Sequence, residues 1–352
     1  MRYFHSTISF ALIASLLFSC KKDTPPDGQT VNPATGAYVT NEGSFLNVNA
    51  SVSYISSSGN VLVDPYFDKN NVPLGDVLQS LLLQSNRGFA VLNNSSRIEV
   101  FNSADFSNIA TVEGLDYPRS IIAVSDQKAY ITSGAIDGTV FILDMTTYAL
   151  TGAVAVGMGP EKMTISGDHV FVTNSGGFSE DHTVSVINSS LDAVVTTIDV
   201  GDRPVDAITD ALGRVWVLSA GAIEYDDNWV EIGHTAAMLH CIDPTDFSII
   251  WSAELGVLGN HPDDLAVSSD GTKVYFNLDG VRELNANSPT LPGEMIIPGA
   301  FSSLDVHPSN GEIWTTSISN FVSNSSVYRY SSSGVLKGTF EAGIGSNGVY
   351  WK

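Results

Sequence analysis

Cysteine is nearly absent from this sequence. The chain of 352 residues has two cysteines, Cys20 near the N-terminus and Cys241 in the alternating apolar stretch AMLHCID. Two such residues cannot form a disulfide framework. Because free cysteine behaves mostly as a small hydrophobe, we expect Cys241 to lie buried in a strand.

Basic residues are scarce as well. There are 16 Lys and Arg against 38 Asp and Glu, which gives a formal charge of −22. A field of this sign repels phosphate backbones and anionic lipid surfaces. We therefore expect no nucleic-acid partner, and the composition leaves cations, neutral sugars and zwitterionic or cationic small molecules as ligands.

Several motifs of catalysis are missing. The sequence contains no HExxH, no paired CxxC and no His-x-His cluster, so it gives no support for a zinc site. It also lacks the Gly-x-Ser-x-Gly nucleophile elbow and a glycine-rich phosphate loop between a strand and a helix. Residues 343–348 read GIGSNG, but they precede the last predicted strand with no helix after them.

Long hydrophobic runs are limited to residues 8–18. This run is shorter than the roughly 20 residues of a transmembrane helix and has the size of a signal-peptide core. It leads into the letters LFSC, which resemble a bacterial lipobox, so Cys20 is expected to become the lipidated first residue. The sequence thus predicts a signal peptide at 1–19, a polar tether at 20–35 and a globular body at 36–352.

A strand-rich repeat runs through the predicted body. Similar stretches include AYVTNEGSF at 37–45, AYITSGA at 129–135 and VFVTNSGG at 170–177. An aromatic residue near the start of the second strand recurs at intervals of 51, 41, 41, 45, 59 and 39 residues: Tyr38, Phe89, Tyr130, Phe171, Trp216, Tyr275 and Trp314. A strand-rich period of about 40 to 45 residues is the signature of propeller blades.

The unit at 157–200 shows the pattern most fully. It reads as a Gly-x-x-Pro turn and four strands, MTIS, VFVTN, TVSVIN and VVTTIDV. The first unit lacks a first strand, and Gly348 to Trp351 can supply it. The segment 64–76 lacks EF-hand spacing and is predicted to be a wide connection between blades one and two. The sequence therefore predicts an all-β, seven-bladed propeller of four-stranded antiparallel blades, closed by the C-terminal strand in the first blade.

One face of such a disc should carry the function. Loops that leave the second strand and turns that lead into the first strand emerge together there. The longest of these loops holds the aromatic pair Tyr225 and Trp229, which suits a ring-shaped or sugar-like ligand, unless the two rings only pin the loop down. The predicted ligand-binding residues are Asn41, Glu42, Asn93, Asn94, Arg119, Asn174, His182, Tyr225, Asn228, Trp229 and Asp263.

The turns that lead into the first strands, which we call the leading turns, also carry acidic residues. Glu161, Asp206, Asp263 and Asp264 would meet near the central channel as an acidic ring able to gather a cation such as Ca²⁺. Alternatively, these carboxylates cap turns or accept backbone hydrogen bonds. His182 stands beside two acidic residues, which offers a second metal hypothesis against that of a solvated loop histidine.

The Gly-x-x-Pro turns, the YVTN-like second strands and the VSVIN third strand resemble the YVTN-type β-propeller repeats of secreted and surface-layer proteins. The stretches YVTNEGSF, LGDVLQSL and NNSSRIEVFNSADF further resemble lipoprotein propellers of Bacteroidetes-type bacteria. This resemblance implies a lipid-anchored protein of the outer membrane, at the cell surface or on the periplasmic face. It also implies binding of cobalamin or another corrinoid and its transfer to an outer-membrane TonB-dependent transporter.

Three functions fit these observations. The favoured one is non-enzymatic capture of a small molecule, such as cobalamin or another transporter substrate, on the loop face. The first alternative is a metal-dependent hydrolase or lactonase with an ion on its acidic inner loops. The second is a protein-interaction scaffold in a surface complex. Composition does not separate them, because each needs only a rigid propeller with variable loops.

Overall fold

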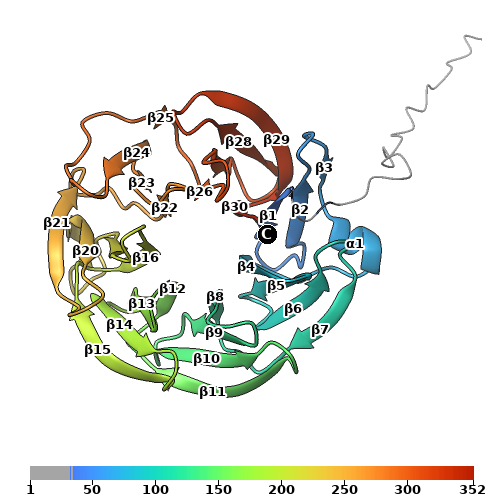
Figure 1. The fold of residues 1–352 in the computed structure, drawn as a ribbon, viewed down its shortest axis with the longest axis horizontal. Helices are drawn as coiled ribbons and strands as arrows, with labels where there is room; N and C mark the ends of the chain where they lie inside the picture. The colour runs from blue at the N-terminus through green and yellow to red at the C-terminus, as the bar shows by residue number, and fades with distance from the viewer. Residues whose placement is uncertain (1–31, 33–34) are drawn as a thin grey trace, which may run out of the picture. The chain divides into compact units, whose positions relative to one another are not determined.

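The described part of the chain is a seven-bladed propeller. The computed structural model describes Asn32 and residues 35–352, and seven four-stranded antiparallel sheets surround a central axis in it (Figure 1). The predicted fold class is thereby confirmed. The predicted signal peptide, Cys20 and most of the tether lie outside the described residues. Within the described residues, no helix has the length and apolar character needed to cross a membrane.

The blades follow one another along the chain, each with its strands ordered from the axis outward. Blade one consists of β30 (Ser346–Tyr350), β1 (Ala37–Asn41), β2 (Ser51–Ile55) and β3 (Val61–Leu62). Blade two consists of β4 (Leu78–Gln84), β5 (Arg87–Leu92), β6 (Arg97–Asn102) and β7 (Asn108–Val112). Blade three consists of β8 (Pro118–Ala123), β9 (Lys128–Ser133), β10 (Thr139–Asp144) and β11 (Ala149–Ala155). Blade four consists of β12 (Pro160–Ser166), β13 (His169–Asn174), β14 (Thr183–Asn188) and β15 (Ala193–Asp199).

The remaining blades have the same order. Blade five consists of β16 (Pro204–Thr209), β17 (Val215–Ser219), β20 (Ala237–Ile242) and β21 (Ile249–Leu255). Blade six consists of β22 (Leu265–Val267), β23 (Lys273–Asn277), β24 (Gly280–Asn285) and β25 (Ile297–Pro298). Blade seven consists of β26 (Ser303–Val306), β27 (Ile313–Ser317), β28 (Asn324–Tyr330) and β29 (Leu336–Ile344). A hairpin of β18 (Ile223–Tyr225) and β19 (Glu231–His234) is inserted in blade five.

The hydrophobic core lies between neighbouring blades. The seven repeated aromatic residues all sit in second strands and are at most 4% exposed. Tyr38 of blade one clusters with Phe101 of blade two, and Trp216 of blade five clusters with Phe276 of blade six. Burying a side chain of this size stabilises the fold by about 2–3 kcal/mol. Such contacts hold each blade against the next and give the loops a rigid base.

The two ends of the described chain meet in blade one. Strand β1 pairs with both β2 and β30, with Val39 opposite Val349, as Figure 1 shows near the C-terminus. Asn41, predicted to begin a loop, is instead the fully buried last residue of β1. Its Oδ1 accepts hydrogen bonds from Ser346 Oγ (2.6 Å) and Gly343 N (3.1 Å). Asn41 thus holds β30 against β1 by side-chain hydrogen bonds, because its position in the strand register turns the side chain inward.

The connection at 63–77 contains a short helix that we did not predict. Helix α1 (Pro65–Asn70) begins after Asp64, whose carboxylate accepts a hydrogen bond from Phe67 N (3.1 Å). An aspartate at the N-cap followed by proline is a sequence pattern that favours the start of a helix. The rest of the prediction, a wide connection between blades one and two, is correct.

Candidate functional site

A cavity of about 500 Å³ lies on the propeller axis, and every inner strand or its leading turn contributes to the wall. The first and second strands of every blade pair in the same register. The second-strand residue that follows the repeated aromatic always faces one residue of the first strand, as Val172 faces Met163 in blade four. In each blade, the two residues before this facing residue line the cavity, as Glu161 and Lys162 do before Met163. The first ring is Gln79, Arg119, Glu161, Val205, Asp263, Ser302 and Asn347, and the second is Ser80, Ser120, Lys162, Asp206, Asp264, Ser303 and Gly348.

Charge is unevenly distributed around these rings. We call the ionic residues from blades three to six the charged half: Arg119, Glu161, Lys162, Asp206, Asp263 and Asp264. We call the ring residues of blades seven, one and two the neutral half: Ser302, Ser303, Asn347, Gly348, Gln79 and Ser80. The predicted crowding of leading-turn residues at the channel is therefore present, but the ionic residues of the two rings lie on one side.

Lys162 neutralises much of the predicted acidic ring. Its Nζ lies 2.8 Å from Asp206 Oδ2 and 2.5 Å from Asp264 Oδ1, so blade four is joined to blades five and six. Each carboxylate also accepts a backbone hydrogen bond, from Leu265 and Leu304 respectively. Burial alone lowers the pKa of Lys162, but the two carboxylates outweigh it and raise that pKa well above its usual value. Burial raises the pKa of Asp264, and Lys162 offsets only part of this effect.

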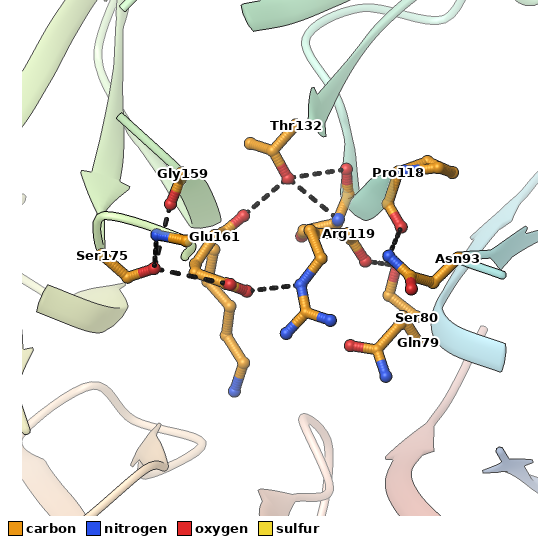
Figure 2. A network of polar contacts seen from close by, with 12 residues as sticks. Gln79, Ser80, Asn93, Pro118, Arg119, Thr132, Gly159, Glu161 and Ser175 are labelled. Carbon is orange, nitrogen blue, oxygen red and sulfur yellow. Dashed lines mark hydrogen bonds and ion pairs between the residues drawn. The ribbon is translucent and has the colours of Figure 1, made fainter. Parts of the chain in front are cut away.

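Arg119 presents part of its guanidinium to the cavity. Its Nε lies 2.8 Å from Glu161 Oε2, and its carbonyl accepts a hydrogen bond from Ser80. Nη1 and Nη2 have no hydrogen-bond partner among the described residues, and Figure 2 shows the guanidinium between Glu161 and Gln79. A planar fork with free N–H groups suits a carboxylate, phosphate or carbonyl group.

Asp263 is the acid of the charged half that has no ion pair among the described residues. Glu161 pairs with Arg119, whereas Asp206 and Asp264 share Lys162. The surrounding protein desolvates Asp263 and raises its pKa, and Lys162 lowers it in part. A cationic or hydrogen-bond-donating ligand group beside Asp263 would relieve this cost.

The polar side chains of the neutral half form hydrogen bonds with other groups of the protein. Asn347 Nδ2 lies 3.0 Å from Glu42 Oε1, and Gln79 Nε2 lies 3.2 Å from the same oxygen. Burial raises the pKa of Glu42. It also raises the pKa of Asp305 to about 6, although Asp305 accepts a hydrogen bond from Val349 N. The acids on this side thus shift toward their uncharged forms.

The leading turns hold the ring residues through an unusual backbone conformation. The residue before the first strand has a positive φ in five blades, at Val77 (57°), Tyr117 (45°), Gly159 (55°), Arg203 (53°) and Gly345 (70°). For a residue other than glycine this costs on the order of 1 kcal/mol or more. A Cβ on Gly159 would lie 2.0 Å from Gly177 N, so only glycine fits there. The chain therefore enters each of these strands at a fixed angle.

Several predicted site residues stabilise loops rather than line the cavity. Asn93 Nδ2 lies 3.2 Å from the Pro118 carbonyl, and Asn94 Nδ2 lies 2.5 Å from Asp76 Oδ2. Asn174 is fully buried, and its Nδ2 donates to the hydroxyls of Thr183 and Ser185 at 2.9 and 3.0 Å. His182 is exposed on the loop after β13.

The blade-five hairpin carries the predicted aromatic pair and lies apart from the axial cavity wall. Tyr225 is 48% exposed and Trp229 is 83% exposed, with ring centroids 6.1 Å apart. Asn228 lies in the turn between them, where Asp226 accepts its backbone N–H at 2.8 Å. Because these rings contact each other and solvent, they offer exposed stacking surface.

Two histidines connect this hairpin to the leading turn of blade six. His261 Nδ1 lies 2.7 Å from the Ala220 carbonyl, which requires a proton on that nitrogen. His261 Nε2 lies 3.0 Å from His234 Nδ1, and His234 Nε2 lies 3.1 Å from Glu231 Oε1. This chain of contacts braces the base of the hairpin close to Asp263.

Within Asn32 and residues 35–352, exposed aromatic side chains lie only in the connections of the predicted binding face. These connections join β1 to β2, β3 to β4, β7 to β8, β13 to β14, β17 to β20 and β27 to β28. The exposed aromatic residues of the described chain are Phe45, Phe67, Tyr117, Phe178, Tyr225, Trp229 and Phe321. Apolar surface and the charged cavity thus belong to loops and turns of the same face.

The described residues contain no group of three or more His, Cys, Asp or Glu side chains arranged to hold a metal ion. In the acidic ring, the Lys162 ammonium lies between two of the carboxylates that we expected to gather a cation. The metal-dependent hydrolase stays a hypothesis from the sequence.

Sequence reasoning missed Lys162, Gln79 and Asn347 as cavity residues. A usable signal existed for Lys162, because it stands two residues after the proline of a Gly-x-x-Pro turn, as Asp206 and Asp264 stand after theirs. Gln79 and Asn347 follow leading turns without proline, so no such marker identified them. Only the strand register places all three around one axis.

Comparisons with known proteins support the fold and the family. A chain of Kuenenia stuttgartiensis hydrazine synthase superposes with a TM-score of 0.63 at 16% identity, covering 79% of this chain and 89% of that one. A chain of a mitotic checkpoint complex superposes with a TM-score of 0.57 at 13% identity, covering 95% and 89%. These likenesses show the propeller fold alone, and no curated protein matches the sequence. Residues 35–337 match the DUF5074 family, described as a domain of unknown function, and the chain therefore belongs to that family.

Proposed function

We propose that this propeller is a binding protein that holds a small polar molecule in the axial cavity. The observation that carries the proposal is a cavity of about 500 Å³ with the free N–H groups of Arg119 and the unpaired Asp263 on its first ring. Concave sites with a few convergent polar groups are the usual binding sites of proteins. The ligand would offer an acceptor or anionic group to Arg119 and a donor or cationic group to Asp263.

Preorganisation is the physical basis of this binding. The ring residues stand on paired inner strands and fixed leading turns, and several are already held by ion pairs. Little side-chain motion is lost when a ligand enters such a site, so more of the interaction energy appears as affinity. The charges of both signs would select zwitterionic or strongly dipolar molecules.

A finer proposal is that the ligand is a corrinoid such as cobalamin. The resemblance to YVTN-type lipoprotein propellers supports it, together with the exposed aromatic residues of the same face. The wide corrin ring would lie across the mouth of the cavity, and its amide side chains would reach the ring residues. In this proposal Cys20 anchors the protein at the outer membrane, and a TonB-dependent transporter receives the ligand.

The test is a binding screen followed by matched variants. The full chain is titrated with cobalamin and cobinamide by calorimetry and screened by thermal shift against polar metabolites. Arg119→Gln should weaken binding about tenfold or more through the lost charge-assisted hydrogen bonds. Arg119→Lys should retain part of the affinity, and Lys337→Gln, the same charge change at an exposed site on β29, should have no effect. Binding that is indifferent to Arg119→Gln would place the ligand elsewhere.

A protein-interaction scaffold is the second candidate function. The exposed side chains of Phe45, Phe178, Trp229 and Phe321 on one face favour it, because exposed apolar surface often marks an interaction site. Recovery of a stable membrane-protein partner that is lost on Phe178→Ser would support this role.

A further inference from the structure

The connection between the second and third strands is shortest in blade six. Only residues 278–279 connect β23 to β24 there, whereas residues 220–236 connect the corresponding strands of blade five. The hairpin therefore stands beside a blade that has almost no loop of its own.

Two hollows lie beside this short connection, next to the axial cavity. The inner hollow has a volume of about 320 Å³ and shares Asp263 with the axial cavity. The outer hollow has a volume of about 280 Å³ and shares Asn260, Leu278 and Asp279 with the inner one. The shared residues make the three spaces neighbours, and we call the inner and outer hollows together the blade-six trough.

The charges along the trough change sign from the axis outward. Asp263 lies at the inner end, Asp279 lies in the shared middle part, and Arg282 lies in the outer hollow. The rest of the lining is mixed, with the buried Leu278 in both hollows, Phe301 in the wall of the inner one, and the polar side chains of Asn260, His261 and Asn277 beside them.

These charged groups keep free bonding capacity. Asp279 Oδ2 accepts a hydrogen bond from Asn260 Nδ2 at 2.9 Å, and Oδ1 has no partner among the described residues. Arg282 Nε donates to the Leu278 carbonyl at 3.2 Å, which leaves Nη1 and Nη2 without a partner in the same part of the chain. The trough thus offers carboxylates at its inner part and a guanidinium at its outer end.

We propose that the blade-six trough binds a short peptide, with its free amino group toward Asp263 and Asp279 and its terminal carboxylate at Arg282. This inference rests on the proposed function, because the inner hollow shares Asp263 with the axial cavity. A peptide carries both end charges and a chain between them that tolerates apolar contacts. A neutral sugar would offer no charge to Asp263 or Arg282, and covering a charge with a ligand that does not pair with it opposes binding.

The test uses three forms of one peptide on the full chain. Trialanine, N-acetyl-trialanine and trialanine amide are titrated by calorimetry, with dialanine and tetraalanine to find the length that fits. N-acetylation removes the cation and amidation removes the anion, and each should weaken binding to the wild-type protein about tenfold. Asp263→Asn should abolish the effect of acetylation, and Arg282→Gln should abolish the effect of amidation. Asp227→Asn, on the exposed tip of the hairpin, is the control that should change neither.

Three results would overturn the proposal: no binding of any peptide at millimolar concentration, equal binding of all three forms, or end effects that persist in both variants. The outcome can be separated from that of the proposed function. Arg282 lies outside the axial cavity wall, so a cavity ligand that depends on Arg119 but not on Arg282 would leave the proposed function intact and remove only the peptide.

Discussion

The two halves of the axial cavity stand on equivalent strands but join their blades by different interactions. In the charged half, Lys162 and Arg119 link blades three to six through ion pairs. In the neutral half, where the chain ends meet, the links are amide and hydroxyl hydrogen bonds, such as those of Gln79 to Glu42 and of the Thr316 hydroxyl to the Ser346 carbonyl. The neutral half closes the ring and uses most of its polar groups to do so. The charged half keeps free groups, and we therefore assign ligand binding to it.

Deleting residues 345–352 should have the largest effect on stability. The deletion removes β30, exposes the pairing edge of β1 and uncovers the core around Val39. We expect a loss of more than about 5 kcal/mol, which is the whole stability of many domains, and hence no cooperative unfolding transition in circular dichroism. Removing only the exposed Lys352 should change the unfolding free energy by about 0.5 kcal/mol or less. A normal transition after the larger deletion would contradict ring closure by β30.

Lys162→Met tests the ion pairs of the charged half. Removing one partner of a buried pair costs about 3–5 kcal/mol, and solvent in the channel screens part of this, so we expect a loss of about 1–3 kcal/mol in urea unfolding. Lys69→Met breaks an exposed pair with Asp105 and should cost about 0.5 kcal/mol or less. Equal losses in the two variants would show that the channel pairs do not hold the blades together.

Asp305→Asn tests whether the acids around the neutral half have raised pKa values, through the pH dependence of stability. Burial raises the pKa of Asp305 to about 6, so its folded form binds a proton more tightly than its unfolded form. Protonation of Asp305 therefore stabilises the folded wild-type protein at low pH, and this contribution is lost as pH rises from about 4 through 6. The variant has no such contribution to lose. Burial lowers the pKa of His240 to about 4, so in both proteins the contribution of His240 to the unfolding free energy increases as pH rises.

The measurement for Asp305→Asn is the difference in unfolding free energy between the variant and the wild type at pH 4.5 and pH 7. Taking this difference cancels the contribution of His240. The variant should gain on the order of 1–2 kcal/mol relative to the wild type across this interval. A difference that does not change with pH would mean that Asp305 is not desolvated.

The double variant Tyr225→Ala, Trp229→Ala should have the smallest effect. Both rings are exposed and contact chiefly each other, so the unfolding free energy should change by about 0.5 kcal/mol or less. Binding of a molecule confined to the axial cavity should change less than about threefold in titration. A larger loss would mean that the ligand reaches the hairpin, as the corrinoid proposal allows.

Sequence patterns reveal this fold because each blade repeats the same strand order and the same buried aromatic residue. They also place the acidic leading turns near the axis. They do not show which side chains meet across the channel, because Lys162 and Asp264 are far apart in sequence and only closure of the ring brings them together. Asn41 and Asn174 read as the starts of loops, but the strand register turns both side chains inward.

The most direct test of the account compares one variant from each half of the cavity. The titration uses cobalamin and the tightest-binding metabolite of the screen with Arg119→Gln and with Gln79→Met, which both keep the approximate size of the first-ring side chain. The account predicts that Arg119→Gln weakens binding about tenfold or more, while Gln79→Met changes it less than about threefold. Strong dependence on Gln79 with none on Arg119 would contradict the assignment of ligand binding to the charged half.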